Sequence, residues 1–174
     1  MTNFELIIAA VLLLIFLSGC VTERTVVVDN ETLEMQAFFD KCNTLPDFFG
    51  AMMAEGFHYA NEIDDMNFYV DKPPAPEKTY ARKWANCVGF ASFVAAFIKY
   101  KGTAADSYQI ISLRQRGVAG IVVKWHEIVI AKVGDQLYET SNLQIRAIDN
   151  VEQSRLLWAS AGYSEWEVIE IWNK

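Results

Sequence analysis

The first pattern in the chain is an unbroken apolar run from Leu6 to Leu17. A helix of that length reaches about 18 Å, well short of the roughly 30 Å hydrocarbon core of a bilayer. The run therefore favours the apolar region of a signal peptide over a membrane-spanning helix. We expect residues 1–19 to form a signal peptide, residues 20–29 a tether or a first strand, and residues 30–174 the folded domain.

Apolar positions at helical spacing predict a first helical region from about Glu31 to Ala60, with Asn30 as its N-cap. A break is expected near Leu45-Pro46, because proline disfavours helix in the residue before it. The polar stretch from Asp64 to Lys83 contains three of the four prolines of the chain and predicts a loop.

A second helix is expected from Cys87 to about Tyr100, with Asn86 as N-cap and Lys101-Gly102 at its end. Its apolar stripe comprises Cys87, Ala91, Val94 and Ile98. Because these positions share one side of a helix, the Cys87 side chain belongs to the buried stripe, at its open end.

After this helix the pattern changes to the alternation that is typical of strands. The expected strands are Tyr108–Leu113, Gly120–Val133, Gln136 to about Asn142, and Ser164–Trp172. Gly134-Asp135 predicts a hairpin turn, and Asn150–Ala161 suits a helix. Helices followed by antiparallel strands predict an α+β domain whose sheet packs on the helix that begins at Cys87.

Composition narrows the class of protein. The 174 residues suffice for one domain with a hydrophobic core, and the net charge is −7. An acidic chain without a basic stripe is a poor nucleic-acid binder, so we expect no nucleic-acid partner. The 3 cysteines are too few for a disulfide framework. We expect no metal or other cofactor, because no second Cys/His pair stands at ligand spacing.

Cys87 is the candidate nucleophile because of its place at a helix start. The unpaired N–H groups there favour a thiolate, and they can stabilise an oxyanion once sulfur has attacked a carbonyl. Cys42 lies within the first helical region, where a packing role is expected. Many free cysteines are simply small buried apolar residues, so a catalytic role for Cys87 requires a base nearby.

His126 is the candidate base, because it lies on the apolar face of a strand, and a strand holds a side chain rigidly. The other histidine, His58, is expected at the surface near the end of the first helical region. Two residues on the next strand compete to orient the imidazole. Glu139 shares the face parity of His126, whereas Asn142 falls almost opposite His126 across the hairpin.

These residues resemble the active-site region of transglutaminase-like cysteine peptidases, a superfamily with bacterial members. Asn86-Cys87-Val88-Gly89-Phe90-Ala91 opens a helix that ends at Lys101-Gly102-Thr103-Ala104. A later strand carries His126, and the strand after it ends at Leu137-Tyr138-Glu139-Thr140. The resemblance covers the chain from about Tyr80 to Asn142.

The resemblance implies a papain-like fold with three catalytic roles. Cys87 would be the nucleophile, and His126 would be the general base and then the general acid. Glu139 would orient the imidazole, although members of the superfamily usually have Asp at this place. If Asn142 held that role instead, the set would be Cys-His-Asn, as in papain.

Three residues are candidates for the oxyanion site or the substrate wall beside the Cys87 N–H: Asn86, Trp84 and Tyr80. Each has a structural alternative. Asn86 would then cap the helix, and Trp84 and Tyr80 would pack in the core.

The end of the apolar run, Leu17-Ser18-Gly19-Cys20, resembles the bacterial lipobox, in which the cysteine becomes the lipid-modified first residue of the mature protein. The preceding Met1–Glu5 departs from the pattern, since it holds no Lys or Arg and carries an acid. The alternative is an uncleaved anchor with an incidental Cys20. Both alternatives place the remaining chain outside the cytoplasm, held at a membrane.

Together these features predict a lipid-anchored thiol enzyme of the bacterial cell envelope. Cys87 would attack an amide carbonyl, and water or an amine would release the acyl-enzyme. We favour hydrolysis of proteins or peptides over transamidation, because no second site for an amine donor is evident. The alternative is an inactive adaptor lipoprotein that binds a partner through the Phe68–Tyr80 loop and through Trp166 and Trp172.

Overall fold

The computed structural model describes residues 30–60 and 74–174. Cys20 lies outside the described residues, together with the expected signal peptide and tether. The part of the Phe68–Tyr80 loop before residue 74 lies outside them as well.

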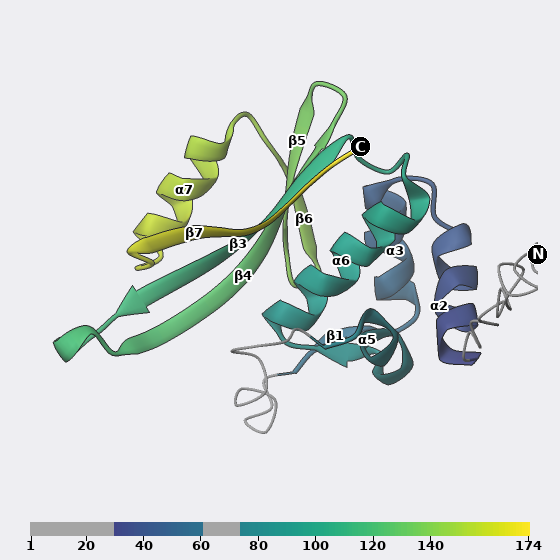
Figure 1. Cartoon of the computed structure of the whole chain (residues 1–174), viewed down its shortest axis with the longest axis horizontal. Coiled ribbons are helices and arrows are strands. Elements are labelled where there is room, and N and C mark those ends of the chain that lie inside the picture. Colours follow the sequence, from purple (N-terminus) through teal and green to yellow (C-terminus); the bar gives the residue numbers. More distant parts are fainter. Residues whose placement is uncertain (1–29, 61–73) are drawn as a thin grey trace, which may run out of the picture.

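A five-stranded antiparallel sheet runs through the centre of the domain in the order β6-β5-β4-β3-β7 (Figure 1). Its strands are β3 (Ser107–Arg116), β4 (Val122–Val133), β5 (Gln136–Ser141), β6 (Gln144–Ile148) and β7 (Glu165–Asn173). The turn η1 (Val118–Gly120) joins β3 to β4. The two-residue strands β1 (His58–Tyr59) and β2 (Trp84–Ala85) form a separate parallel pair.

Helices cover both faces of the sheet (Figure 1). The helices on one side are α2 (Asn30–Asp40), α3 (Leu45–Ala54), α5 (Pro76–Arg82) and α6 (Cys87–Lys101). Helix α6 packs on β4, and α2 and α5 pack against α6. On the other side lies α7 (Val151–Ser160), which is capped by the Asn150 side chain. The predicted α+β class is confirmed.

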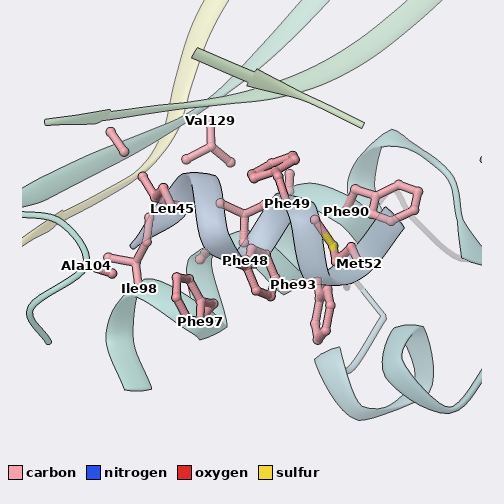
Figure 2. Close-up of a cluster of buried hydrophobic side chains, with 14 of the residues drawn as sticks. Leu45, Phe48, Phe49, Met52, Phe90, Phe93, Phe97, Ile98, Ala104 and Val129 are labelled. Carbon is pink, nitrogen blue, oxygen red and sulfur yellow. The ribbon is translucent and has the colours of Figure 1, made fainter. Parts of the chain in front are cut away.

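The larger core fills the space between α6 and the sheet, and Figure 2 shows its centre. Phe48 of α3 stacks on Phe97 of α6 with ring centroids 4.2 Å apart. Val129 of β4 closes this core from the sheet side. Because aromatic rings bury large apolar areas, this cluster fixes α6 firmly against β4.

A smaller core lies on the opposite face of the sheet, under α7. It includes Ile128 and Ile130 of β4, with Trp158 of α7 packed against it. Strand alternation sends neighbouring residues of β4 to opposite cores. His126 shares the face of Ile128, so the apolar face on which it lies is covered by α7 and not by α6.

The predicted break of the first helical region is confirmed, because Thr44 caps α3 and Pro46 sits in its first turn, where a missing N–H costs nothing. Other elements differ from the sequence-based predictions: α3 ends at Ala54 and not near Ala60, where the short strand β1 lies instead. Helix α5 occupies part of the predicted loop and also begins with a proline, Pro76. Strand β6 was not predicted, since it is only five residues long and its residues are mixed in polarity.

Candidate active site

Cys87 is the first residue of α6, as predicted. The side chain of Asn86 accepts hydrogen bonds from the backbone N–H groups of Val88 and Gly89, each at 3.1 Å. Gly89 allows a close approach of the preceding segment, because a Cβ there would lie 2.7 Å from the Cβ of Ala85. The cap and the glycine together fix the direction in which the Cys87 side chain leaves the helix.

The Cys87 thiol is buried, with 8% of the residue exposed. Burial raises its pKa to about 11, although the backbone N–H groups of Glu127, Val88 and Cys87 face the sulfur and act in the opposite direction. The backbone N–H groups favour the thiolate as predicted, but the prediction that the pKa of this thiol is lowered overall is wrong. Desolvation outweighs the helix terminus, and the group is a neutral thiol.

His126 projects from β4 on the α7 side of the sheet. Its ring centroid lies 4.9 Å from that of Trp158 and 6.2 Å from that of Tyr163. Burial lowers the pKa of the imidazole to about 4, against the smaller opposing effect of Glu139. The ring is neutral at physiological pH, with one nitrogen free to accept a proton.

Ser141, and neither expected residue, holds the imidazole. The Nε2 atom of His126 lies 2.8 Å from Ser141 Oγ. The prediction that Glu139 orients the ring is wrong at this contact, and so is the alternative with Asn142. Asn142 forms the turn after β5 with φ 52°, and its buried Oδ1 has no hydrogen-bond donor among the described residues.

Glu139 instead ties β5 to its neighbours. Its carboxylate accepts hydrogen bonds from Arg146 of β6 and from Ser154 and Trp158 of α7, the last at 3.1 Å. Glu139 is only 2% exposed, so these donors satisfy a buried charge. The residue acts on His126 electrostatically while its hydrogen bonds hold α7 on the sheet.

The Cys87 sulfur faces the backbone N–H of Glu127 from the α6 side of β4, whereas the ring of the preceding residue, His126, lies on the α7 side. Strand β5 pairs with β4 only from Val129 onward, which leaves the backbone N–H of Glu127 free to face the Cys87 sulfur. Tyr163 lies near both groups. Its ring neighbours that of His126, and its pKa is raised first by burial and second by the charge of ionised Cys87. Among the described residues, no hydrogen bond joins the thiol to the imidazole.

The three expected wall residues have structural roles. Asn86 is the helix cap described above. Tyr80 packs against the α6-side core, with its ring centroid 5.5 Å from that of Phe38. Trp84 lies in β2, with the Arg82 guanidinium 5.0 Å from its ring centroid.

Other sequence-based predictions have clear outcomes. Cys42 is buried in the core and donates to the Phe38 carbonyl at 3.6 Å, so its packing role is confirmed. His58 is exposed, as expected. Trp166 and Trp172 are half-buried against the two cores, and Trp172 stacks on Tyr108. Those two tryptophans do not form the free aromatic surface that the adaptor hypothesis needs.

Two pockets include residues that contact or neighbour the candidate groups. A pocket of about 630 Å³ is bordered by α3, the β5–β6 hairpin and α7, and its lining includes Ser141 and Trp158. A second pocket, of about 500 Å³, lies between α6 and the sheet, and its lining includes Val88, Trp125 and Glu127. Val88 and Trp125 pack with Cys87, so the second pocket begins beside the thiol.

Sequence reasoning missed Ser141 and Glu127. Ser141 carries no charge and belongs to the tail of a short strand, so nothing in its type distinguishes it. Glu127 was detectable, because an acid directly beside the candidate base interrupts an otherwise apolar strand. Burial raises the pKa of its carboxyl to about 7, against the opposing charge of Arg114.

Within residues 30–60 and 74–174, no three His, Cys, Asp or Glu side chains gather closely enough to hold a metal ion. The helices of the same two ranges are all too short or too polar to cross a bilayer. No protein-family model matches the chain, and a search of curated proteins finds no match.

Proposed function

We propose that the protein is a thiol enzyme that cleaves or transfers amide bonds through an acyl-enzyme on Cys87. His126 is the base, and Ser141 orients its ring. The observation that carries the proposal is the 2.8 Å contact of His126 Nε2 with Ser141, at the strand edge where the Cys87 sulfur faces the Glu127 N–H. Nucleophilic catalysis requires a thiol and a base that has its own orienting partner; His126 has that partner, and the Cys87 sulfur faces the N–H of the next residue of β4.

The chemistry starts from a neutral thiol and a neutral imidazole. In the tautomer that carries its proton on Nε2, His126 donates to Ser141 Oγ and keeps Nδ1 as the proton acceptor. The pKa values of about 11 and about 4 disfavour a resting ion pair. The thiol proton therefore moves to the imidazole only while sulfur bonds to the substrate carbonyl, which is general-base catalysis.

The later steps use the same groups. The N–H groups of Cys87 and Glu127 lie at the sulfur, where negative charge develops on the attacked carbonyl oxygen next to it, whereas the Val88 N–H also donates to the Asn86 cap. The imidazolium returns its proton to the leaving amine, and the thioester then reacts with water or an amine. Hydrolysis of proteins or peptides remains the favoured outcome.

The proposal is tested with p-nitrophenyl acetate and the full-length protein. We expect release of one equivalent of nitrophenolate and the mass increase of one acetyl group, which peptide mapping assigns to Cys87 and not to Cys42. Cys87→Ala abolishes the burst. Absence of acetylation at Cys87 in folded protein contradicts the enzyme proposal and leaves the inactive adaptor. That second candidate is favoured by one observation, the neutral Ser141 where related enzymes use an acid.

We also propose that Cys20 attaches the protein to a membrane as a bacterial lipoprotein of the cell envelope. The support is the apolar run followed by Leu17-Ser18-Gly19-Cys20. Cys20→Ala should leave the precursor unprocessed and without lipid, as measured by intact mass and detergent partitioning. A wild-type protein whose Cys20 carries no lipid in a bacterial host contradicts this proposal.

A further inference from the structure

The Glu127 side chain is largely buried, but its carboxylate oxygens are accessible from a pocket. The residue is 6% exposed, and it lines the pocket of about 500 Å³ between α6 and the sheet. Within the described part of the chain, no group donates a hydrogen bond to this carboxylate. A carboxyl group that opens on a pocket and has no protein donor is complementary to a donor that a ligand supplies.

The other charges around the pocket are already paired. Arg114 Nη2 lies 2.9 Å from a Glu167 oxygen, and Lys99 Nζ lies 2.7 Å from a Glu170 oxygen. Glu127 is therefore the acid in this pocket that has no ion pair among the described residues, and a bound cation would favour its ionised, charged form. A ligand with a cationic group complements that charge, whereas an anionic ligand is repelled by it.

The pocket is connected to the nucleophile. Val88 and Trp125 line it and also pack with Cys87, while the backbone N–H of Glu127 faces the sulfur. An acyl group bonded to Cys87 can extend from the sulfur into this space. Apolar residues along the walls suit a short methylene chain, and they include Ala95, Ile110 and Ile169.

We propose that this pocket binds the acyl part of the substrate and that Glu127 pairs with a primary amine carried by it. The inference rests on the proposed function and narrows its substrates to amides whose acyl part bears an amino group. Glu127 is then a specificity residue that acts through the substrate and has no part in proton transfer at the sulfur.

The test compares matched pairs of p-nitrophenyl esters. The ester of β-alanine is paired with the butanoate, and the ester of ε-aminocaproate with the heptanoate, so that each pair differs by an ammonium in place of a methyl group. For each pair, the ratio of the two kcat/KM values is divided by the ratio of the second-order rate constants with which the same two esters acylate the free thiol N-acetylcysteine. This division removes the intrinsic reactivity of the esters. The variants are Glu127→Gln and, as the matched control, Glu167→Gln, which removes an acid that already pairs with Arg114.

We expect the wild-type protein to prefer an amine ester about tenfold or more, the contribution of a hydrogen bond to a charged group. Glu127→Gln should lose the preference, and Glu167→Gln should keep it. Acylation of Cys87 with no amine preference, or a preference that survives in Glu127→Gln, overturns the inference alone. Failure of every ester to acylate Cys87 overturns the proposed function and, with it, the inference.

Discussion

At the scale of single residues, the neighbours His126 and Glu127 point to opposite faces of β4. Both side chains are buried, and burial favours the neutral form of each. Burial lowers the pKa of His126 from 6.5 to about 4 and raises that of Glu127 from 4.5 to about 7. Both shifts have desolvation as their main cause. Each group therefore makes the stability of the fold depend on pH, and the two effects have opposite signs.

The sign follows from which state binds more protons. Between about pH 4 and 6.5 the unfolded chain protonates His126 more than the folded chain does, so stability rises with pH across that window. Between about pH 4.5 and 7 the folded chain keeps the proton on Glu127, so stability falls as pH rises. Each effect amounts to about 3 kcal/mol over its full window.

Single substitutions should separate the two effects. Relative to wild type, His126→Gln leaves the Glu127 effect unopposed, so its free energy of unfolding falls more steeply with pH between about 4.5 and 6.5. In Glu127→Gln the His126 effect is unopposed, so the free energy of unfolding rises more steeply with pH over the same range. Urea unfolding at several pH values measures both slopes. Slopes identical to wild type in both variants would show that these two groups do not titrate as their burial requires.

Glu139 gives a second prediction at this scale. Its carboxylate has three donors in α7 and β6, so Glu139→Gln should destabilise the fold by about 2 kcal/mol, less than for a fully buried ion pair because Arg146 is half exposed. Urea unfolding measures the loss. A variant with unchanged stability but acylation as slow as in His126→Gln would restore Glu139 as the residue that orients the imidazole.

At the scale of elements, helix α6 positions the nucleophile through its cap and its contact with the preceding segment. Gly89→Ala would place a Cβ 2.7 Å from the Cβ of Ala85 and 3.3 Å from Thr79 Oγ1. We expect a loss of about 1–3 kcal/mol in stability and slower acylation of Cys87, because the first turn must move.

The matched control for that substitution is Gly50→Ala in α3. A Cβ at Gly50 meets nothing within 4 Å, so alanine there should stabilise the fold by about 0.5–1 kcal/mol. Thermal unfolding of the two variants gives the comparison. Equal effects of the two substitutions would mean that the close approach at Gly89 does not constrain α6.

The elements also show what the sequence can and cannot specify. Local chemistry predicted α6, since Asn86 caps it and Gly102 ends it in the left-handed conformation. The hairpin turn at Gly134-Asp135 was also predicted from local chemistry, because glycine readily adopts the positive φ that Gly134 has there. Helix α5 was missed because Pro76 and the prolines just before it suggested a loop, although Pro76 suits the first turn of a helix.

The candidate site was predictable in its residue types and not in its contacts. Cys87 and His126 follow from a helix start and a strand, which are local properties. The partner of His126 depends on where the pairing of β5 with β4 stops, at Thr140 and Val129, and on what α7 covers. Those are tertiary properties, so the sequence could not show that Ser141, and not Glu139 two residues before it, contacts the imidazole.

At the scale of the whole molecule, the sheet separates two cores, with α6 on one side and α7 on the other (Figure 1). The proposed site combines residues from both faces of β4. Helix α6 presents Cys87 from one side, while α7 and β5 hold His126 from the other. One pocket opens at Ser141 and another at Glu127. On the proposed function, these two spaces would hold the acyl group and the rest of a substrate.

The central claim is that neutral His126 activates the neutral thiol of Cys87, and the pH dependence of acetylation by p-nitrophenyl acetate tests it most directly. In wild type the rate should be nearly independent of pH between about 5 and 9, because the base stays neutral above its pKa of about 4 and the thiol stays protonated below about 11. In His126→Gln the rate should follow the thiolate alone, rising about tenfold per pH unit and falling at least about 100-fold below wild type at pH 7. A wild-type rate that rises with pH in parallel with that of His126→Gln would contradict the claim.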